Sequence, residues 1–357
     1  MTNIFLNLFI LLISIIISLL LCEIFARKVF PPEKAVYQYS HEDYFWDHDL
    51  GNFRIKPGTI SSWDNGYNYE DIFTDKHSFR TIKQDMKNEE IQDIFVVGDS
   101  QSFGHGLPYE KSWVYQLSLL LNEKINNSSF PGYGPFQYEK IILKYLNLIK
   151  NRTIIMGITD NDLCSARETE FKPHDKELLE KYIFINKSEY FLETPIKFIR
   201  YYTGLGKMIY SSLKKFQGTK FGSLIYKKYY RSKEYFINNP LHNGECKISF
   251  INWISKISNL ANNNNIDLII LIIPHPQRPM NMAVGKHNKH YEGLIKEIEN
   301  LSKENKFKVI DTLNVLMKQY KNNNFRRTSL LLPIDDHYGI EGNQIIANIL
   351  YENYQNK

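Results

Sequence analysis

Short apolar runs alternate with longer amphipathic runs from residue 94 to the end of the chain. The apolar runs predict strands at Ile94–Val97, Ile125–Asn127, Thr153–Gly157, Asp267–Ile273 and Phe307–Ile310. The amphipathic runs place apolar residues on one helical face and predict helices at 136–150, 249–263, 291–305, 312–321 and 341–354. This alternation favours right-handed crossovers, and therefore a three-layer α/β/α sandwich with a central parallel sheet and helices on both faces.

The run 267–273 is apolar at nearly every position, as expected for a central strand that is buried on both faces. In open parallel sheets, ligands bind at the carboxyl ends of the strands. The polar residues that directly follow each predicted strand are therefore the candidates for chemistry.

Two segments depart from the alternation. Residues 31–90 are polar and aromatic, with turn signals such as "KPGT" and "DNGY", and predict a lead-in segment that packs on the main domain at 91–357. The segment at about 165–245 is basic and rich in tyrosine, and it predicts a helical insertion into that domain.

The N-terminal segment Ile4–Cys22 carries no charged residue. At about 1.5 Å per residue, a helix of this length matches the roughly 30 Å hydrocarbon core of a bilayer, which predicts a single-pass transmembrane anchor at 4–22. A cleaved signal peptide is disfavoured because no basic region precedes the segment and no small-residue cleavage pattern follows it. Lipid attachment at Cys22 is disfavoured because Leu21 is not a small residue.

The charges give two further indications. Arg27, Lys28 and Lys34 follow the anchor, and the positive-inside rule then favours a cytoplasmic main domain. The net charge of +5 is mild for 357 residues and does not argue for nucleic acid, so we expect no nucleic-acid partner. The basic insertion is compatible with contact to anionic lipid headgroups, but solvated helices that cover the cleft are the favoured interpretation.

The chain has three cysteines, of which Cys22 lies in the anchor. We expect Cys164 and Cys246 to be two free, buried thiols. The alternative is a disulfide between them if the main domain lies outside the cytoplasm, which would stabilise the fold by roughly 4–5 kcal/mol through loop entropy. The cysteines lack the spacing of metal ligands, and we predict no metal and no cofactor.

Ser100 follows the first predicted strand in the stretch "IFVVGDSQSFGHGL". A sharp turn after a strand exposes a serine hydroxyl at the edge of the sheet, where a neighbouring base can activate it as a nucleophile. The alternatives are a strand that ends in an ordinary Asp-Ser turn, and a loop that binds phosphate. The tripeptide by itself does not decide between them.

Three later segments also carry candidate groups. Gly132 follows the second strand, where an unobstructed backbone amide can donate to an oxyanion, and Asn161 follows the third strand with a side-chain amide that can do the same. His337 precedes the last helix, with Asp335 and Asp336 just before it, and a histidine oriented by an acid is a general base for serine. Each segment alone is also typical of a solvated turn.

Taken in order, these four segments resemble the motifs of the SGNH/GDSL hydrolase family. The resemblance runs from roughly Phe45 to the end and includes "DKHSFRT", "SFGHGLPYEKSW" and "PGYGPFQ", which look like segments of membrane-anchored bacterial members. It implies a flavodoxin-like fold and a catalytic domain on the extracytoplasmic side of the membrane.

The resemblance assigns a role to each candidate residue. Ser100 would be the nucleophile, and its amide would form the oxyanion hole together with the Gly132 amide and the Asn161 side chain. His337 would be the base, oriented by Asp335.

This chain departs from the family pattern near the histidine. The usual acid lies three residues before it, where this chain has Ile334, so the acid is Asp335 or, less favoured, Asp336. His105 lies five residues after Ser100 and could border the pocket, although a surface or packing role is favoured.

The implied function is hydrolysis of an acyl or O-acetyl ester of a small molecule, lipid or glycan, through an acyl-serine intermediate. Two alternatives stay open. One is an O-acyltransferase that modifies a cell-envelope polysaccharide, in which a sugar takes the place of water. The other is a catalytically silent envelope protein that binds glycan or a partner.

Overall fold

The computed structural model describes residues 2–29, 43–64, 69–160, 162, 204, 208, 212, 244–285, 289–324, 330–332 and 337–355. The predicted insertion therefore lies almost entirely outside the described residues. The same holds for Asn161, Asp335 and Asp336.

Five parallel strands form one side of an eight-stranded sheet: β6 (Ile94–Gly98), β7 (Ile125–Asn127), β8 (Thr153–Ile158), β9 (Asp267–Ile272) and β10 (Lys308–Asp311). Their order is β10-β9-β8-β6-β7, which is the order of flavodoxin-like sheets. The order in which successive strands are added to the sheet reverses direction between β6 and β8. Sheets of this kind bind ligands beyond the carboxyl ends of the strands at the point of reversal. All five predicted strands are present, and the predicted parallel core is confirmed.

Three antiparallel strands extend the sheet beyond β7, which the sequence patterns did not predict. They are β3 (Ile60–Asp64), β4 (Tyr69–Thr74) and β5 (Arg80–Thr81), and β5 pairs with β7 through Arg80 and Asn127. A separate hairpin precedes them, made of β1 (Tyr44–Asp47) and β2 (Asn52–Ile55). Strands joined by short connections pair antiparallel, because a parallel pair needs a long crossover.

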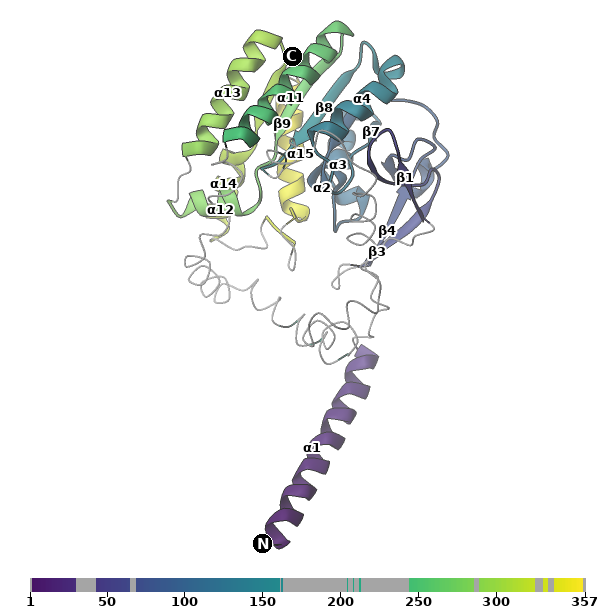
Figure 1. Cartoon of the computed structure of the whole chain (residues 1–357), viewed down its shortest axis with the longest axis vertical. Coiled ribbons are helices and arrows are strands. Elements are labelled where there is room, and N and C mark those ends of the chain that lie inside the picture. Colours follow the sequence, from purple (N-terminus) through teal and green to yellow (C-terminus); the bar gives the residue numbers. More distant parts are fainter. Residues whose placement is uncertain are drawn as a thin grey trace.

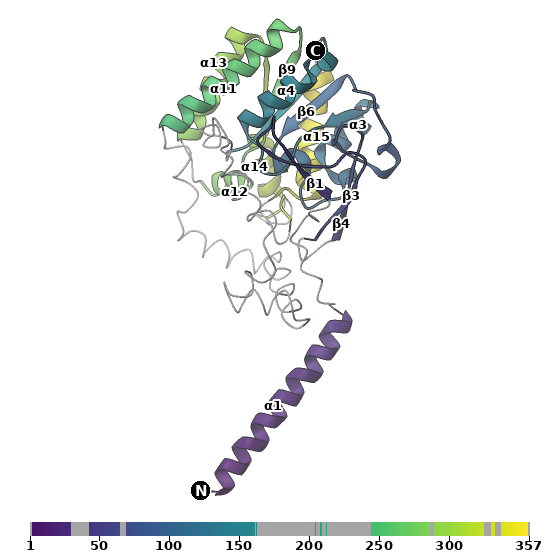
Figure 2. The same ribbon diagram turned by 45° about the vertical axis from the view of Figure 1, so that its right-hand side comes forward.

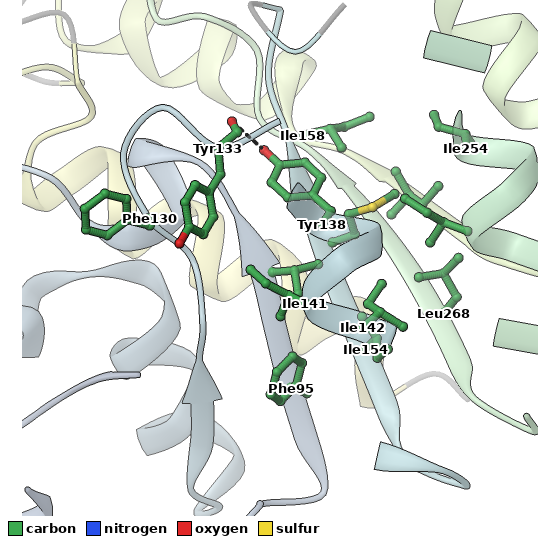
Figure 3. Packing of buried hydrophobic residues seen from close by; sticks show 14 of the residues in the cluster. Phe95, Phe130, Tyr133, Tyr138, Ile141, Ile142, Ile154, Ile158, Ile254 and Leu268 are labelled. Carbon is green, nitrogen blue, oxygen red and sulfur yellow. Dashed lines mark hydrogen bonds between the residues drawn. The ribbon is translucent and has the colours of Figure 1, made fainter. Parts of the chain in front are cut away.

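Helices cover both faces of the sheet (Figure 1 and Figure 2). One face carries α4 (Pro135–Ile149), α11 (Gly244–Asn263) and α13 (Lys289–Asn305), and the other carries α3 (Trp113–Leu121), α14 (Leu313–Asn322) and α15 (Ile340–Gln355). Successive residues of β6 supply both cores, since Phe95 packs under α4 while Val96 packs under α3 and α15. Figure 3 shows the first core, in which Ile141 and Ile142 of α4 pack near Phe95.

The helix α1 (Thr2–Val29) extends away from this body, with the N-terminus at its far end (Figure 1). Its stretch Phe9–Ala26 has a mean hydropathy of 2.8 and only 6% of it is buried. Among the described residues this is the one helix that is long and apolar enough to cross a membrane, and a signal sequence passes the same test. The end of α1 is bonded to one described residue of the predicted insertion, because the Gly204 amide donates to the Glu23 carboxylate at 2.9 Å.

Cys246 is fully buried in α11 and is bonded in a disulfide, so the expectation of two free thiols is wrong. Cys22 is a free cysteine, and the chain has three cysteines in total. The alternative partner predicted for Cys246 is Cys164, which lies outside the described residues.

The first helical turn after β6 packs tightly against the sheet. Gly98 and Gly157 face each other across β6 and β8, and a Cβ added to either would lie 2.3 Å or 2.1 Å from the Ser102 hydroxyl oxygen. Ser102 is fully buried there. The two glycines therefore make the space into which the turn that carries Ser100 fits.

The space beside Ser102 yields a stability prediction. Gly157→Ala should lower the free energy of unfolding by about 1–3 kcal/mol, because overpacking forces a buried neighbour to move. Adding Ser102→Ala should restore most of the loss, because the nearest remaining side-chain atom, the Ser102 Cβ, is 3.4 Å away. Chemical denaturation of the full chain in detergent measures both. Gly293→Ala is the control, since nothing lies within 4 Å of its added Cβ, and an equal loss there would contradict the packing argument.

Candidate active site

Ser100 and His337 meet at the carboxyl edge of the sheet. The Nε2 atom of His337 lies 2.8 Å from the Oγ atom of Ser100, although the two residues are 237 positions apart. Both side chains are partly exposed. The structure thus brings together the predicted nucleophile and the predicted base at hydrogen-bonding distance.

The turn after β6 fixes Ser100 at the first position of the short helix α2 (Ser100–Phe103). Asp99 caps this helix, with its carboxylate accepting from the Gln101 amide at 2.9 Å. Gly104 ends it in the left-handed region with φ of 79°. A strand followed directly by a capped turn presents the serine side chain beyond the sheet, as in a nucleophile elbow.

The loop that carries His337 is held to the same turn. The Tyr338 amide donates to the Gln101 side-chain oxygen at 3.2 Å, so the residues next to the nucleophile and next to the base are bonded to each other. The Tyr338 hydroxyl donates to the Pro274 carbonyl at 2.7 Å, beyond the end of β9. The Leu332 amide donates to the His337 carbonyl at 2.9 Å. These bonds leave the loop little freedom to carry the imidazole away from Ser100.

Gly132 lies in a turn beside the end of β6. The Tyr133 amide donates to the Phe130 carbonyl at 3.1 Å, and Gly132 has φ of 80° at the third position of this turn. A proline followed by a left-handed glycine is typical of a type II turn. The Phe130 amide donates to the Gly98 carbonyl at 3.2 Å, which places the turn next to the strand end that precedes Ser100.

The turn around Asn161 is fastened on both sides of that residue. The Thr159 hydroxyl donates to the Asp99 carboxylate at 3.0 Å, and the Thr159 amide donates to the Asp162 carboxylate at 2.8 Å. The Tyr138 hydroxyl donates to the same Asp162 carboxylate at 3.1 Å. The turn after β8 is thereby bonded to the turn that carries Ser100.

Two acidic groups at this edge have raised pKa values. Burial, together with the nearby negative charge of Asp99, raises the pKa of Asp162 well above its usual range. Burial likewise raises the pKa of Asp311, at the end of β10, to about 6. The Asp311 carboxylate accepts from the Leu313 amide at 2.9 Å and from the Tyr291 hydroxyl at 3.4 Å.

An ion pair lies close to these groups. The Arg278 guanidinium donates to the Asp160 carboxylate at 2.6 Å and stands 4.3 Å above the Tyr291 ring. Arg278 belongs to α12 (Gln277–Ala283), which follows β9. The residue directly before Asn161 is therefore bonded to the helix that follows the next strand of the sheet.

Sequence reasoning missed two contributors to this edge and did not favour a third. His105 was expected to be a surface or packing residue, yet its ring centroid lies 4.6 Å from that of His337. Arg80 and Arg278 were not singled out, although both are among the charged groups nearest these turns. The quoted segment "DKHSFRT" contains Arg80 and was the one available signal for it.

No protein-family model matches the chain, and no curated protein matches it either. Solved structures that are similar to it include a protein of the G-D-S-L family from Desulfitobacterium hafniense, with 14% identity over 72% of this chain and 97% of that one, at a TM-score of 0.39. An acetyl xylan esterase has 11% identity over 73% of this chain and 98% of its own, at 0.40. An acetylxylan esterase from Geobacillus stearothermophilus has 10% identity over 72% and 92%, at 0.38.

The first of these structures carries the family name that the sequence motifs predict. At these identities, and with TM-scores below 0.5, the chemistry has to be argued from the residues of this chain.

The raised pKa of Asp311 gives a pH-dependent prediction. Its ordinary pKa is 3.8 and its folded value is about 6, so between these values the folded state keeps a proton that the unfolded chain has released. Stability therefore falls as the pH rises through this window. Asp311→Asn cannot ionise, and its unfolding midpoint should exceed that of the natural protein at pH 7, with the difference vanishing near pH 4.

Thermal unfolding followed by circular dichroism from pH 4 to pH 7 measures this difference. Asp49→Asn, at an exposed position, is the matched control. A difference that is the same at every pH would contradict the protonation of Asp311 in the folded state.

Proposed function

We propose that this protein is a serine esterase of the SGNH/GDSL type that cleaves acyl or O-acetyl esters. The observation that carries the proposal is the 2.8 Å contact between Ser100 Oγ and His337 Nε2 at the carboxyl edge of the sheet. A hydroxyl in contact with an imidazole is the minimal unit for activating serine as a nucleophile. The described residues in and beside the four sequence motifs lie at the same edge of the sheet, which supports the same proposal.

The reaction runs in two halves. Ser100 Oγ attacks the ester carbonyl carbon while His337 Nε2 takes the hydroxyl proton, and the tetrahedral intermediate expels the alcohol, which receives that proton. Water then attacks the acyl-serine with His337 again as the base. The free acid leaves and the Ser100 hydroxyl is restored.

The oxyanion that forms in each half requires preorganised donors. The proposed donors are the Ser100 amide, the Gly132 amide and the Asn161 side chain. The Ser100 amide is the first amide of α2, where the helix itself offers it no acceptor, and the turns around the other two donors are bonded to β6 and to Asp99. Asp335 is proposed to orient His337, with Asp336 as the other candidate.

The proposed location of the catalytic body is outside the cytoplasm, with α1 as the membrane anchor. The disulfide at Cys246 supports this, because such bonds persist in oxidising compartments and are rare in the cytosol. The disulfide is stronger evidence than the positive charges that follow the anchor. Disulfides are rare in the reducing cytosol, whereas the positive-inside rule is a statistical bias in the orientation of membrane segments. The substrate is then an ester carried by a small molecule, a lipid or a glycan near the membrane surface.

Alkylation of the denatured protein tests the disulfide. Without a reductant, one of the three cysteines should be modified, and after reduction all three should be. Intact mass spectrometry of protein purified from its natural membrane, with thiols blocked at lysis, gives the count. Three modified cysteines before reduction would contradict both the bond and the argument for an oxidising compartment.

The esterase proposal is tested by chromogenic acetyl and longer acyl esters with the full chain in detergent. Ser100→Ala and His337→Ala should each lower kcat by about 10⁴- to 10⁶-fold, because neither group works without the other. A fluorophosphonate should label the natural protein and not Ser100→Ala.

The matched control is Ser118→Ala, which removes a serine hydroxyl from α3 and should leave turnover unchanged. Absence of both turnover and labelling in the natural protein would overturn the esterase proposal and favour the silent binding protein.

A further inference from the structure

The loop after α2 is shaped so that one side chain stands out from it. Gly104 and Gly106 flank His105, with φ of 79° and 80°. These left-handed conformations are readily adopted by glycine and are strained for other residues. The His105 amide between them donates to the Ser100 carbonyl at 3.0 Å, so the loop folds back onto the nucleophile residue.

Arg80 fastens both ends of this loop from the neighbouring strand β5. One guanidinium nitrogen donates to the carbonyls of Phe103 at 2.6 Å and Gly104 at 2.8 Å, and the other donates to the Leu107 carbonyl at 2.6 Å. The guanidinium also lies 4.4 Å above the Phe103 ring, and Arg80 is only 2% exposed. A buried, planar fork that spans three carbonyls fixes the loop in one conformation.

The side chain that this loop presents meets the candidate base. The ring of His105 lies 4.6 Å from the ring of His337 between centroids, at an interplanar angle of 55°. The same His337 ring reaches Ser100 through Nε2. His337 therefore contacts a hydroxyl through one nitrogen and also packs against an aromatic ring.

We propose that His105, held by Arg80, is a positioning residue that fixes the ring plane of His337 toward Ser100. The torsion that turns a histidine ring is broad, so the contacts that the ring makes decide its plane. The packed ring of His105 restricts the plane of His337 further, beside the contact with Ser100 and the proposed bond to Asp335. The inference rests on the proposed esterase function and adds a residue that acts through His337 and does not itself touch the ester.

The test uses the full chain in detergent, with two readouts: turnover of a chromogenic acetyl ester and the rate of fluorophosphonate labelling. His105→Ala should lower kcat and the labelling rate by about tenfold while KM changes little, since misplacing a reacting group slows the chemical step. His105→Phe keeps a ring in the same place and should retain most of both rates. Thermal unfolding shows which variants are folded.

A double variant separates positioning from general damage to the loop. Arg80→Lys keeps the positive charge but cannot span carbonyls on both sides of His105, and it should slow labelling. If Arg80 acts through His105, the double variant of Arg80→Lys with His105→Ala should be labelled no more slowly than His105→Ala alone. His48→Ala, which removes an exposed histidine, is the matched control and should change nothing.

The outcomes are distinguishable. Labelling of His105→Ala at the natural rate, or equal slowing by His105→Phe and His105→Ala, would overturn the positioning role while leaving the esterase proposal intact. Absence of any Ser100-dependent labelling in the natural protein would remove the esterase proposal first, and this inference with it.

Discussion

The hydrogen bond between Ser100 and His337 joins two segments that are far apart in the sequence, and much of the surrounding structure keeps this contact short. Neither residue is fixed by its own helix or strand alone, because one stands in a turn and the other in a loop. The Gln101 side chain holds the Tyr338 amide, and the Asn343 side chain joins the same loop to the first amide of α3 at 2.9 Å. The contact is thus the product of tertiary bonds between segments that are distant in sequence.

Buried polar groups make the carboxyl edge of the sheet a single unit. The Asp99 and Asp162 carboxylates share Thr159 as a partner, and Tyr138 completes the set from the helix α4. A buried carboxyl group lowers the stability of the fold unless it is hydrogen-bonded. Removal of one member of this set therefore leaves the others buried without a partner, which is unfavourable. These linked hydrogen bonds make the turns rigid. Rigid turns are what the proposed oxyanion donors require in order to be preorganised.

The long-range pattern of the fold was readable from the sequence because burial on both faces leaves a continuous apolar signal, as in β9. The strands β3 to β5 were not predicted, since short strands with polar residues lack that signal. At the site, Ser100 and His337 were found through motifs. The roles of His105 and Arg80 were not, because they depend on a loop conformation and on contacts between chain segments. Cys246 was misjudged because the redox state of a thiol depends on a partner and a compartment that its own neighbours in sequence do not reveal.

Arg80 belongs to two parts of the molecule at once, since its backbone pairs with Asn127 in the sheet and its side chain closes the loop after α2. The smallest fragment that could work as a complete unit must therefore begin well upstream of the strand that leads to Ser100. A chain trimmed to the first recognisable motif would lack this guanidinium, so an absence of turnover in such a fragment would not count against the proposed esterase.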